Sequence, residues 1–282
     1  MVTQLLNLIF GSKNDREIKA LLPIVERING LESGLTAAGL PRQDTAAFLG
    51  AVFDRGVEWV SRGHAAPWLL YLAPYAPHVP LTPPDAFRGA TRAGDYGDYV
   101  RALDHHLGRV LDALDASGAA ADTIVVFASD NGSQFAATGD GHRPNGPLRG
   151  GKWTPYEGGV RTPLLVRWPR QVRAGAVSGA VAALTDLSAT IAAAVGHPLP
   201  EAGDGVSLLP ALAGDDAALA ARPPVLLRAS EGGRYAVRDG RWKWIGGQRD
   251  ELYDLVADPG ETRDLAAAEP AVAARLRALA PR

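Results

Sequence analysis

The chain has 282 residues, of which 46% are hydrophobic and 21% charged, a balance typical of folded globular proteins. The lack of cysteine excludes a disulfide framework, a zinc–thiolate site, an iron–sulfur cluster and a cysteine nucleophile. A net charge of −2 gives no electrostatic reason to expect nucleic acid or a membrane as a partner. Residues 1–10 lack the basic region of a signal peptide, so we expect the chain as written to be cytoplasmic.

The first 30 residues differ in composition from the rest, since they hold two of the four lysines and four of the seven isoleucines. Apolar residues at helical spacing predict a helix over 14–30, which Pro23 should kink or shorten. Residues 5–32 resemble the N-terminus of the translocase ATPase SecA. Because no Walker A motif follows, we infer no ATPase function, and an unrelated amphipathic helix remains the alternative. We treat residues 1–33 as a separate segment of foreign origin.

Residues 44–221 alternate between helical and strand patterns. Apolar stripes predict helices over 44–60, 95–117 and 185–195. Apolar and β-branched runs predict buried strands over 68–72, 123–128 and 163–168. This order is typical of an α/β domain with a largely parallel sheet.

From about residue 222 the chain favours short strands separated by Gly or Asp, so residues 222–282 are predicted to form a small antiparallel unit. The expected strands are 224–229, 234–238, 241–245 and 251–255. The dipeptide Asp239-Gly240 predicts a tight hairpin between the second and third of them. A closing helix is predicted over 262–280, bent near Pro270.

A candidate metal site follows strand 123–128, where the chain reads Ser129-Asp130-Asn131-Gly132. Ligands bind at the carboxyl ends of strands in open α/β sheets. The Asp130 carboxylate and the Asn131 carbonyl are the oxygen ligands that calcium or magnesium prefers. The alternative is a structural turn, because Asn-Gly is also a common turn dipeptide.

Two further candidates lie in loops rich in Pro or Gly. His78, between Pro77 and Pro80, sits on a stiff backbone suited to a general acid or an anion donor. Lys152 lies in the glycine-rich run 148–163 and would place a compact positive charge there. The alternatives are an ordinary surface histidine and a solvated loop. For the run 251–261 we favour a structural role.

In this order the motifs resemble an arylsulfatase-type sulfatase of the alkaline-phosphatase-like superfamily, over about residues 44–282. The residues that carry the resemblance are Pro77-His78-Val79-Pro80, Tyr99-Val100-Arg101-Ala102-Leu103-Asp104, Ser129-Asp130-Asn131-Gly132, Gly151-Lys152, Glu157-Gly158-Gly159-Val160-Arg161-Thr162-Pro163 and Leu252-Tyr253-Asp254-Leu255.

The resemblance implies a mostly parallel sheet flanked by helices, a small C-terminal antiparallel subdomain, and hydrolysis of a sulfate ester in a small molecule or a sulfated glycan. It makes Asp130 and Asn131 calcium ligands. It also makes His78 and Lys152 catalytic residues that contact the sulfate. We therefore expect all four side chains to converge on one pocket at the carboxyl edge of the sheet.

The sequence departs from the family at its nucleophile. Sulfatases form a formylglycine from a C/S-x-P-x-R motif, and this chain has no cysteine and no serine in that context. A pair of aspartates from the first strand is also missing, so we expect an incomplete calcium site. We interpret the chain as the C-terminal portion of a sulfatase, without turnover on its own. The alternatives are a phosphodiester or phosphonate hydrolase of the same superfamily, and a non-catalytic binding module.

Overall fold

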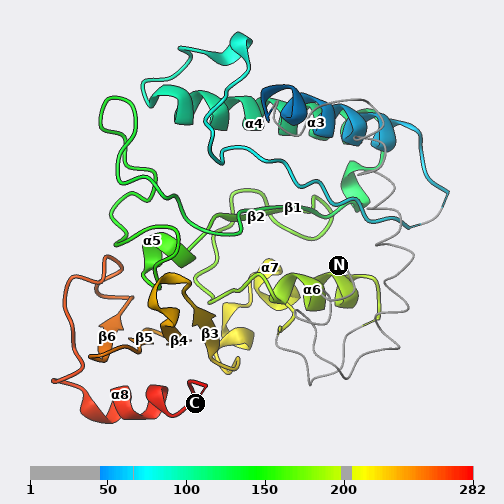
Figure 1. Ribbon diagram of the computed structural model, residues 1–282. Coiled ribbons are helices and arrows are strands. Elements are labelled where there is room, and N and C mark those ends of the chain that lie inside the picture. The colour runs from blue at the N-terminus through cyan, green and yellow to red at the C-terminus, as the bar shows by residue number, and fades with distance from the viewer. Residues whose placement is uncertain (1–44, 66, 198–204, 282) are drawn as a thin grey trace. The chain divides into compact units, whose positions relative to one another are not determined.

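The computed structural model describes residues 45–65, 67–197 and 205–281 (Figure 1). These residues belong to two compact units. The first unit contains the chain up to Ala121 together with Thr138–His142, and the second contains Asp122–Ala137 and Arg143–Arg282. The helix predicted over 14–30 lies outside the described residues, and the domain boundaries near 33, 44 and 221 stay predictions. Within the described ranges, every helix is too short or too polar to cross a membrane.

Two helices form the core of the first unit, α3 (Thr45–Ser61) and α4 (Gly94–Ala116), and both were predicted. They lie side by side in Figure 1. Each buries one stripe at helical spacing. The buried side chains are Leu49, Val52, Phe53 and Val60 from α3, and Tyr99, Ala102, Leu103, Val110 and Leu114 from α4.

Asp98 of α4 fixes the loop that enters this helix after the short helix η1 (Asp85–Phe87). Its carboxylate is 2% exposed and accepts hydrogen bonds from the backbone amides of Gly89 and Thr91, at 2.7 and 2.8 Å. Burial alone raises the pKa of Asp98, but these hydrogen bonds outweigh it and hold the pKa below its ordinary value.

The strand predicted over 68–72 is wrong, because these residues adopt no strand structure. Tyr71 is 62% exposed, so the expected burial also fails. The apolar run is typical of a strand, but a strand forms only where a neighbour accepts its backbone hydrogen bonds. In the described ranges every ladder belongs to other segments of the chain.

In the second unit, β1 (Val125–Ala128) and β2 (Leu164–Arg167) pair in the antiparallel direction, with Val125 opposite Arg167. Both strands were predicted, but the parallel pairing expected for residues 44–221 is wrong for this pair. The intervening chain contains only the one-turn helix α5 (Glu157–Val160) and otherwise consists of turns and loops. It contains no long helix of the kind that usually forms the crossover between parallel strands, and β2 lies beside β1 in the opposite direction.

The predicted helix 185–195 is observed as α6 (Asp186–Ala194), and α7 (Leu209–Leu212) and η3 (Asp216–Leu219) follow it. Asp186 is fully buried and accepts backbone hydrogen bonds from Ala183 and Val206, at 2.7 and 2.9 Å. Its carboxylate also pairs with the buried Arg222 guanidinium at 2.6 Å. Through Asp186, α6 therefore contacts the segment before it, at Ala183, and the segments after it, at Val206 and Arg222.

The C-terminal antiparallel sheet is confirmed, in the order β3-β4-β5-β6. Its strands are β3 (Val225–Arg228), β4 (Tyr235–Asp239), β5 (Trp242–Ile245) and β6 (Glu251–Asp254). The short helix η4 (Glu231–Gly233) joins β3 to β4. The predicted hairpin is present, with Asp239 paired to Trp242 and Gly240 at a φ of +53°.

The closing helix is shorter than predicted, since α8 spans only Pro270–Arg277. Proline suits the first turn of a helix, because the amide it lacks has no partner there. Residues before it form turns held to β6, with the Leu265 amide bonded to the Leu252 carbonyl at 2.8 Å. α8 packs against the sheet in Figure 1, where the buried cluster comprises Val237, Trp244, Leu252, Ala273 and Leu276.

Candidate functional site

The Asp-Asn loop, residues 129–133, leaves the end of β1 in a tight turn. The Ser129 hydroxyl donates to the Asn131 carbonyl at 3.0 Å, and the Asn131 amide side chain donates to the Gly132 carbonyl at 3.1 Å. Gly132 then donates its backbone amide to Gly159 at 2.9 Å. A Cβ atom on Gly132 would lie 1.9 Å from the Gly158 carbonyl oxygen, so only glycine fits here.

The glycine loop, residues 148–160, folds onto the Asp-Asn loop through main-chain contacts. The Lys152 amide donates to the Ser133 carbonyl at 3.1 Å. Asn145 links the same two segments, because it bonds both backbone groups of Ser133 at 2.9 Å and the Gly150 carbonyl at 3.3 Å. The structure therefore joins the loops that carry Asp130, Asn131 and Lys152.

The glycine loop presents a cation and an aromatic ring together. The Lys152 ammonium lies 5.6 Å from the centre of the Trp153 ring, within the range of a cation–π contact. Trp153 is 55% exposed. The loop therefore offers both a positive charge for an anion and an accessible apolar face.

Asp130 and Asn131 match calcium in the kind of their ligand atoms but not in number. Asp130 is exposed, and its carboxylate has no ion-pair partner among the residues described. Calcium takes six to eight oxygens, most of them charged or carbonyl oxygens. In the described ranges there is no group of three or more His, Asp or Glu side chains that could hold a metal ion. These two residues alone do not make a calcium site.

His78 belongs to the first unit and has a defined tautomer. Its Nδ1 atom lies 2.7 Å from the Val79 carbonyl oxygen and 3.0 Å from the Tyr75 hydroxyl, which itself donates to the same carbonyl. A carbonyl only accepts, so Nδ1 carries the proton and Nε2 is left for a ligand. The expected convergence of His78 with Asp130, Asn131 and Lys152 stays a prediction.

A buried charge cluster that no sequence motif indicated supports the glycine loop. The Lys243 ammonium on β5 is completely buried and pairs with Glu157 at 2.8 Å and with Glu261 at 2.9 Å. Glu261 also accepts the Glu157 backbone amide at 2.6 Å. Burial raises the pKa of Glu261, with the Glu157 carboxylate adding to the rise and Lys243 opposing it. The scarcity of lysine in this chain was the available signal for Lys243, as it was for Lys152.

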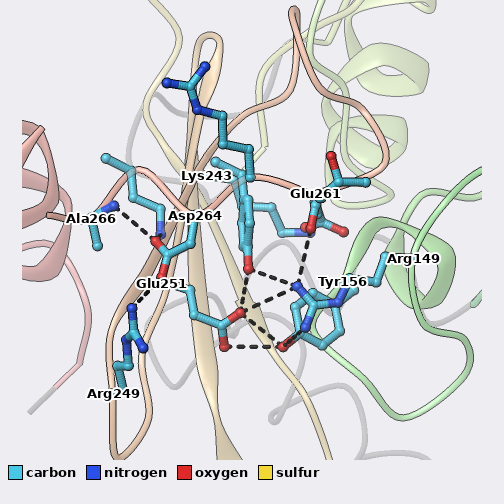
Figure 2. Close-up of polar contacts among 12 residues, drawn as sticks. Arg149, Tyr156, Lys243, Arg249, Glu251, Glu261, Asp264 and Ala266 are labelled. Carbon is cyan, nitrogen blue, oxygen red and sulfur yellow. Dashed lines mark hydrogen bonds and ion pairs between the residues drawn. The ribbon is translucent and has the colours of Figure 1, made fainter. Parts of the chain in front are cut away.

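A second polar cluster lies beside it and connects the glycine loop to β6 (Figure 2). Arg149 donates to the hydroxyls of Tyr253 at 2.8 Å and Tyr156 at 3.1 Å. Both tyrosines donate to Glu251, at 2.5 and 3.0 Å, and Arg234 bonds the same carboxylate. Burial and the Glu251 carboxylate raise the pKa of Tyr253. The run 251–261 therefore has the structural contacts we expected of it.

The comparisons with known proteins agree with this arrangement. Residues 38–197 match the sulfatase family model, which is more than half of the chain. Residues 151–279 match the model described as N-sulphoglucosamine sulphohydrolase, C-terminal. The fold is alkaline-phosphatase-like, as its structural neighbours show. The chain belongs to the sulfatase family.

Its relatives are longer proteins. The chain is similar to an N-acetylgalactosamine-6-O-sulfatase of Bacteroides thetaiotaomicron, with 32% identity over 76% of this chain and 46% of that protein. It is also similar to the steryl-sulfatase of Mus musculus, with 40% identity over 57% of this chain and 27% of the relative. The chain spans less than half the length of these two relatives.

The chain also matches only part of longer proteins among the solved structures. One match is the structure of BT33336S-sulf, from work on the metabolism of multiple glycosaminoglycans by Bacteroides thetaiotaomicron. It has a TM-score of 0.71 and 30% sequence identity, over 80% of this chain and 52% of that one. Ps i-CgsB in complex with k-i-k-neocarrahexaose matches with a TM-score of 0.73 and 27% identity, over 81% of this chain and 53% of that one.

Proposed function

We propose that the Asp-Asn loop and the glycine loop form one side of a site that hydrolyses sulfate esters. Family membership supports the reaction type. The observation that carries the proposal is the 3.1 Å hydrogen bond from the Lys152 backbone amide to the Ser133 carbonyl. This bond holds the glycine loop, with its predicted anion-binding Lys152, against the Asp-Asn loop, with its predicted metal ligands. Both loops follow β1 in one compact unit.

In this proposal the Lys152 ammonium binds the sulfate oxygens and offsets the charge that develops as the S–O ester bond breaks. The role of His78 is carried over from the family resemblance alone: a protonated ring can donate from Nε2 to a sulfate oxygen and then transfer that proton to the leaving oxygen. The hydrogen bond from Nδ1 to Val79 keeps the ring in the orientation that leaves Nε2 available.

Asp130 and Asn131 would contribute oxygen ligands to a calcium ion, in keeping with the family. The described residues supply only one carboxylate and one amide at this position, and we derive no step through the metal. The formylglycine motif is also missing from residues 1–282. We therefore expect this chain to bind sulfate and sulfated sugars without turning them over.

We infer a sulfated sugar as the substrate class, because relatives of this chain are named as sulfatases of N-acetylgalactosamine 6-sulfate. A phosphonate or phosphate ester is the second candidate. The phosphonate monoester hydrolase of Agrobacterium radiobacter shares the fold at 21% identity, with a TM-score of 0.60 over 85% of this chain and 62% of that one. Residues 5–32 precede both family matches, so their resemblance to SecA adds no activity to the proposal.

The test is titration calorimetry of the full chain with inorganic sulfate, inorganic phosphate and N-acetylgalactosamine 6-sulfate. Lys152→Ala should weaken binding of sulfate and of the sulfated sugar by about tenfold to a hundredfold, the loss of one charge-assisted hydrogen bond. Arg173→Ala removes an exposed cation from the same unit and serves as the matched control. Equal affinities for the two variants would contradict the proposal, and tighter binding of phosphate would favour the second candidate.

A further inference from the structure

Residues 151–154 form a tight turn that places a bulky residue in an unusual conformation. The Thr154 amide donates to the Gly151 carbonyl at 3.0 Å, which closes a four-residue turn with Lys152 and Trp153 at its centre. Trp153 has a φ of +77°. A turn with positive φ only at its third residue is of type II, and glycine is the residue that fits this position without strain.

Packing does not explain why tryptophan occupies this position. The Trp153 side chain is 55% exposed, so most of its ring contributes nothing to a core. Strained, exposed residues of this kind are concentrated at ligand-binding sites, where the surrounding structure maintains the conformation. Here the turn is closely packed, because a Cβ on Gly151 would lie 2.6 Å from the Ser133 carbonyl oxygen and the Thr154 hydroxyl donates to the Gly151 carbonyl at 2.8 Å.

The position of the ring relative to Lys152 identifies the ligand class. The ammonium lies 5.6 Å from the ring centre, so a ligand whose anionic group binds Lys152 can also contact the indole. Indole offers a large apolar face together with an N–H donor. A ligand that satisfies both groups carries a sulfate on a ring with an apolar face and polar edges, as a pyranose does.

We propose that Trp153 is a sugar-binding platform that selects sulfated pyranoses over small sulfate esters. This inference rests on the proposed function, since it takes Lys152 as the anion site. Lys152 would supply affinity for any sulfate, and Trp153 would supply the additional affinity for the sugar. Trp153 is thus a specificity-determining residue and takes no part in breaking the ester bond.

The test compares Trp153→Gly and Trp153→Phe in the full chain, with inorganic sulfate and N-acetylgalactosamine 6-sulfate as probes in titration calorimetry. Glycine removes the ring and relieves the strained φ, so Trp153→Gly should melt at or above the temperature of the parent chain. Trp153→Gly should bind the sulfated sugar about tenfold more weakly and inorganic sulfate equally well. Trp153→Phe keeps an aromatic face and should lose less than half of that effect on a logarithmic scale.

The two proposals fail in different ways. The role of Trp153 is overturned, and the anion site at Lys152 is not, in either of two cases. Trp153→Gly binds the sulfated sugar as tightly as the parent chain, or its affinity for inorganic sulfate falls as much as its affinity for the sugar. If the parent chain binds the sulfated sugar no more tightly than inorganic sulfate, the platform is likewise overturned. A different result would overturn the proposed function but support the role of Trp153: the affinity for the sulfated sugar falls in Trp153→Gly and is unchanged in Lys152→Ala.

Discussion

Replacing Lys243 with methionine tests whether the buried charge cluster holds the glycine loop in place. Lys243 and Glu261 are completely buried, and the ammonium lies 2.8 and 2.9 Å from its two carboxylate partners. At an effective dielectric constant near 20, each contact is a gross attraction of about 6 kcal/mol. Desolvation offsets much of this attraction, and removing one partner of a buried pair costs about 3–5 kcal/mol. For a chain of this size we expect a melting temperature about 10 °C lower.

The structure explains why the loss should be large. The Oε1 atom of Glu261 has no hydrogen bond within the described part of the chain, so the Lys243 ion pair is its compensation for burial. Without Lys243, Glu157 and Glu261 become buried carboxylates that repel each other. Burial already raises the pKa of Glu261, so its ionisation destabilises the fold as the pH rises from its unfolded value through the folded one. The deficit of Lys243→Met should therefore shrink on acidification toward the ordinary glutamate pKa of 4.5.

The assay is thermal unfolding by circular dichroism between neutral and mildly acidic pH. The triple variant Lys243→Met, Glu157→Gln and Glu261→Gln removes the ammonium and both of its carboxylate partners. It should recover much of the lost stability, because neither carboxylate is left without its ammonium. A decrease below about 1 kcal/mol for Lys243→Met, or an equal decrease in the triple variant, would show that the buried ion pairs do not hold the glycine loop in place.

Two further substitutions test single contacts by thermal unfolding. Gly132→Ala should cost about 1–3 kcal/mol, since its Cβ would lie 1.9 Å from the Gly158 carbonyl oxygen, and an unchanged melting temperature would show that the loops can separate. Asp98→Asn should cost about 1–3 kcal/mol, because an amide can accept from only one of the Gly89 and Thr91 backbone donors, which are 2.7 and 2.8 Å from the carboxylate. The pKa of Asp98 is lowered, so its contribution should be complete at neutral pH and vanish as the pH falls through that lowered value; a variant with the same acid transition as the parent would contradict this.

Local patterns in the sequence predicted α3, α4, α6 and the C-terminal strands, since spacing and turn residues determine them over short distances. Asp239-Gly240 is the clearest case, because the dipeptide itself favours the observed hairpin. The run 68–72 has an equally strong pattern and forms no strand. Strand pairing depends on a partner elsewhere in the chain, which no local pattern reports.

The site was predictable as a set of loops but not as an assembly. Asp130, Asn131 and Lys152 stand in recognisable motifs, yet the contact between their loops depends on a fit of Gly132 against Gly158 that spacing does not reveal. Lys243 was not predicted as a buried residue, because side chains alternate between the two faces of a strand and a charged residue on β5 is expected on the face toward solvent. The glycine loop covers that face instead and supplies Glu157 as the partner.

The close approach of backbone to backbone at Gly132, Gly158 and Gly159 has a consequence for how this region can change. The shape of the two loops depends on main-chain atoms, while Lys152 is half-buried and the Trp153 side chain is largely exposed. Mutational tolerance should therefore differ sharply between neighbouring positions. A combinatorial library restricted to residues 152 and 153 would vary ligand preference on a constant scaffold, which makes this turn the natural place to begin redesign of the protein.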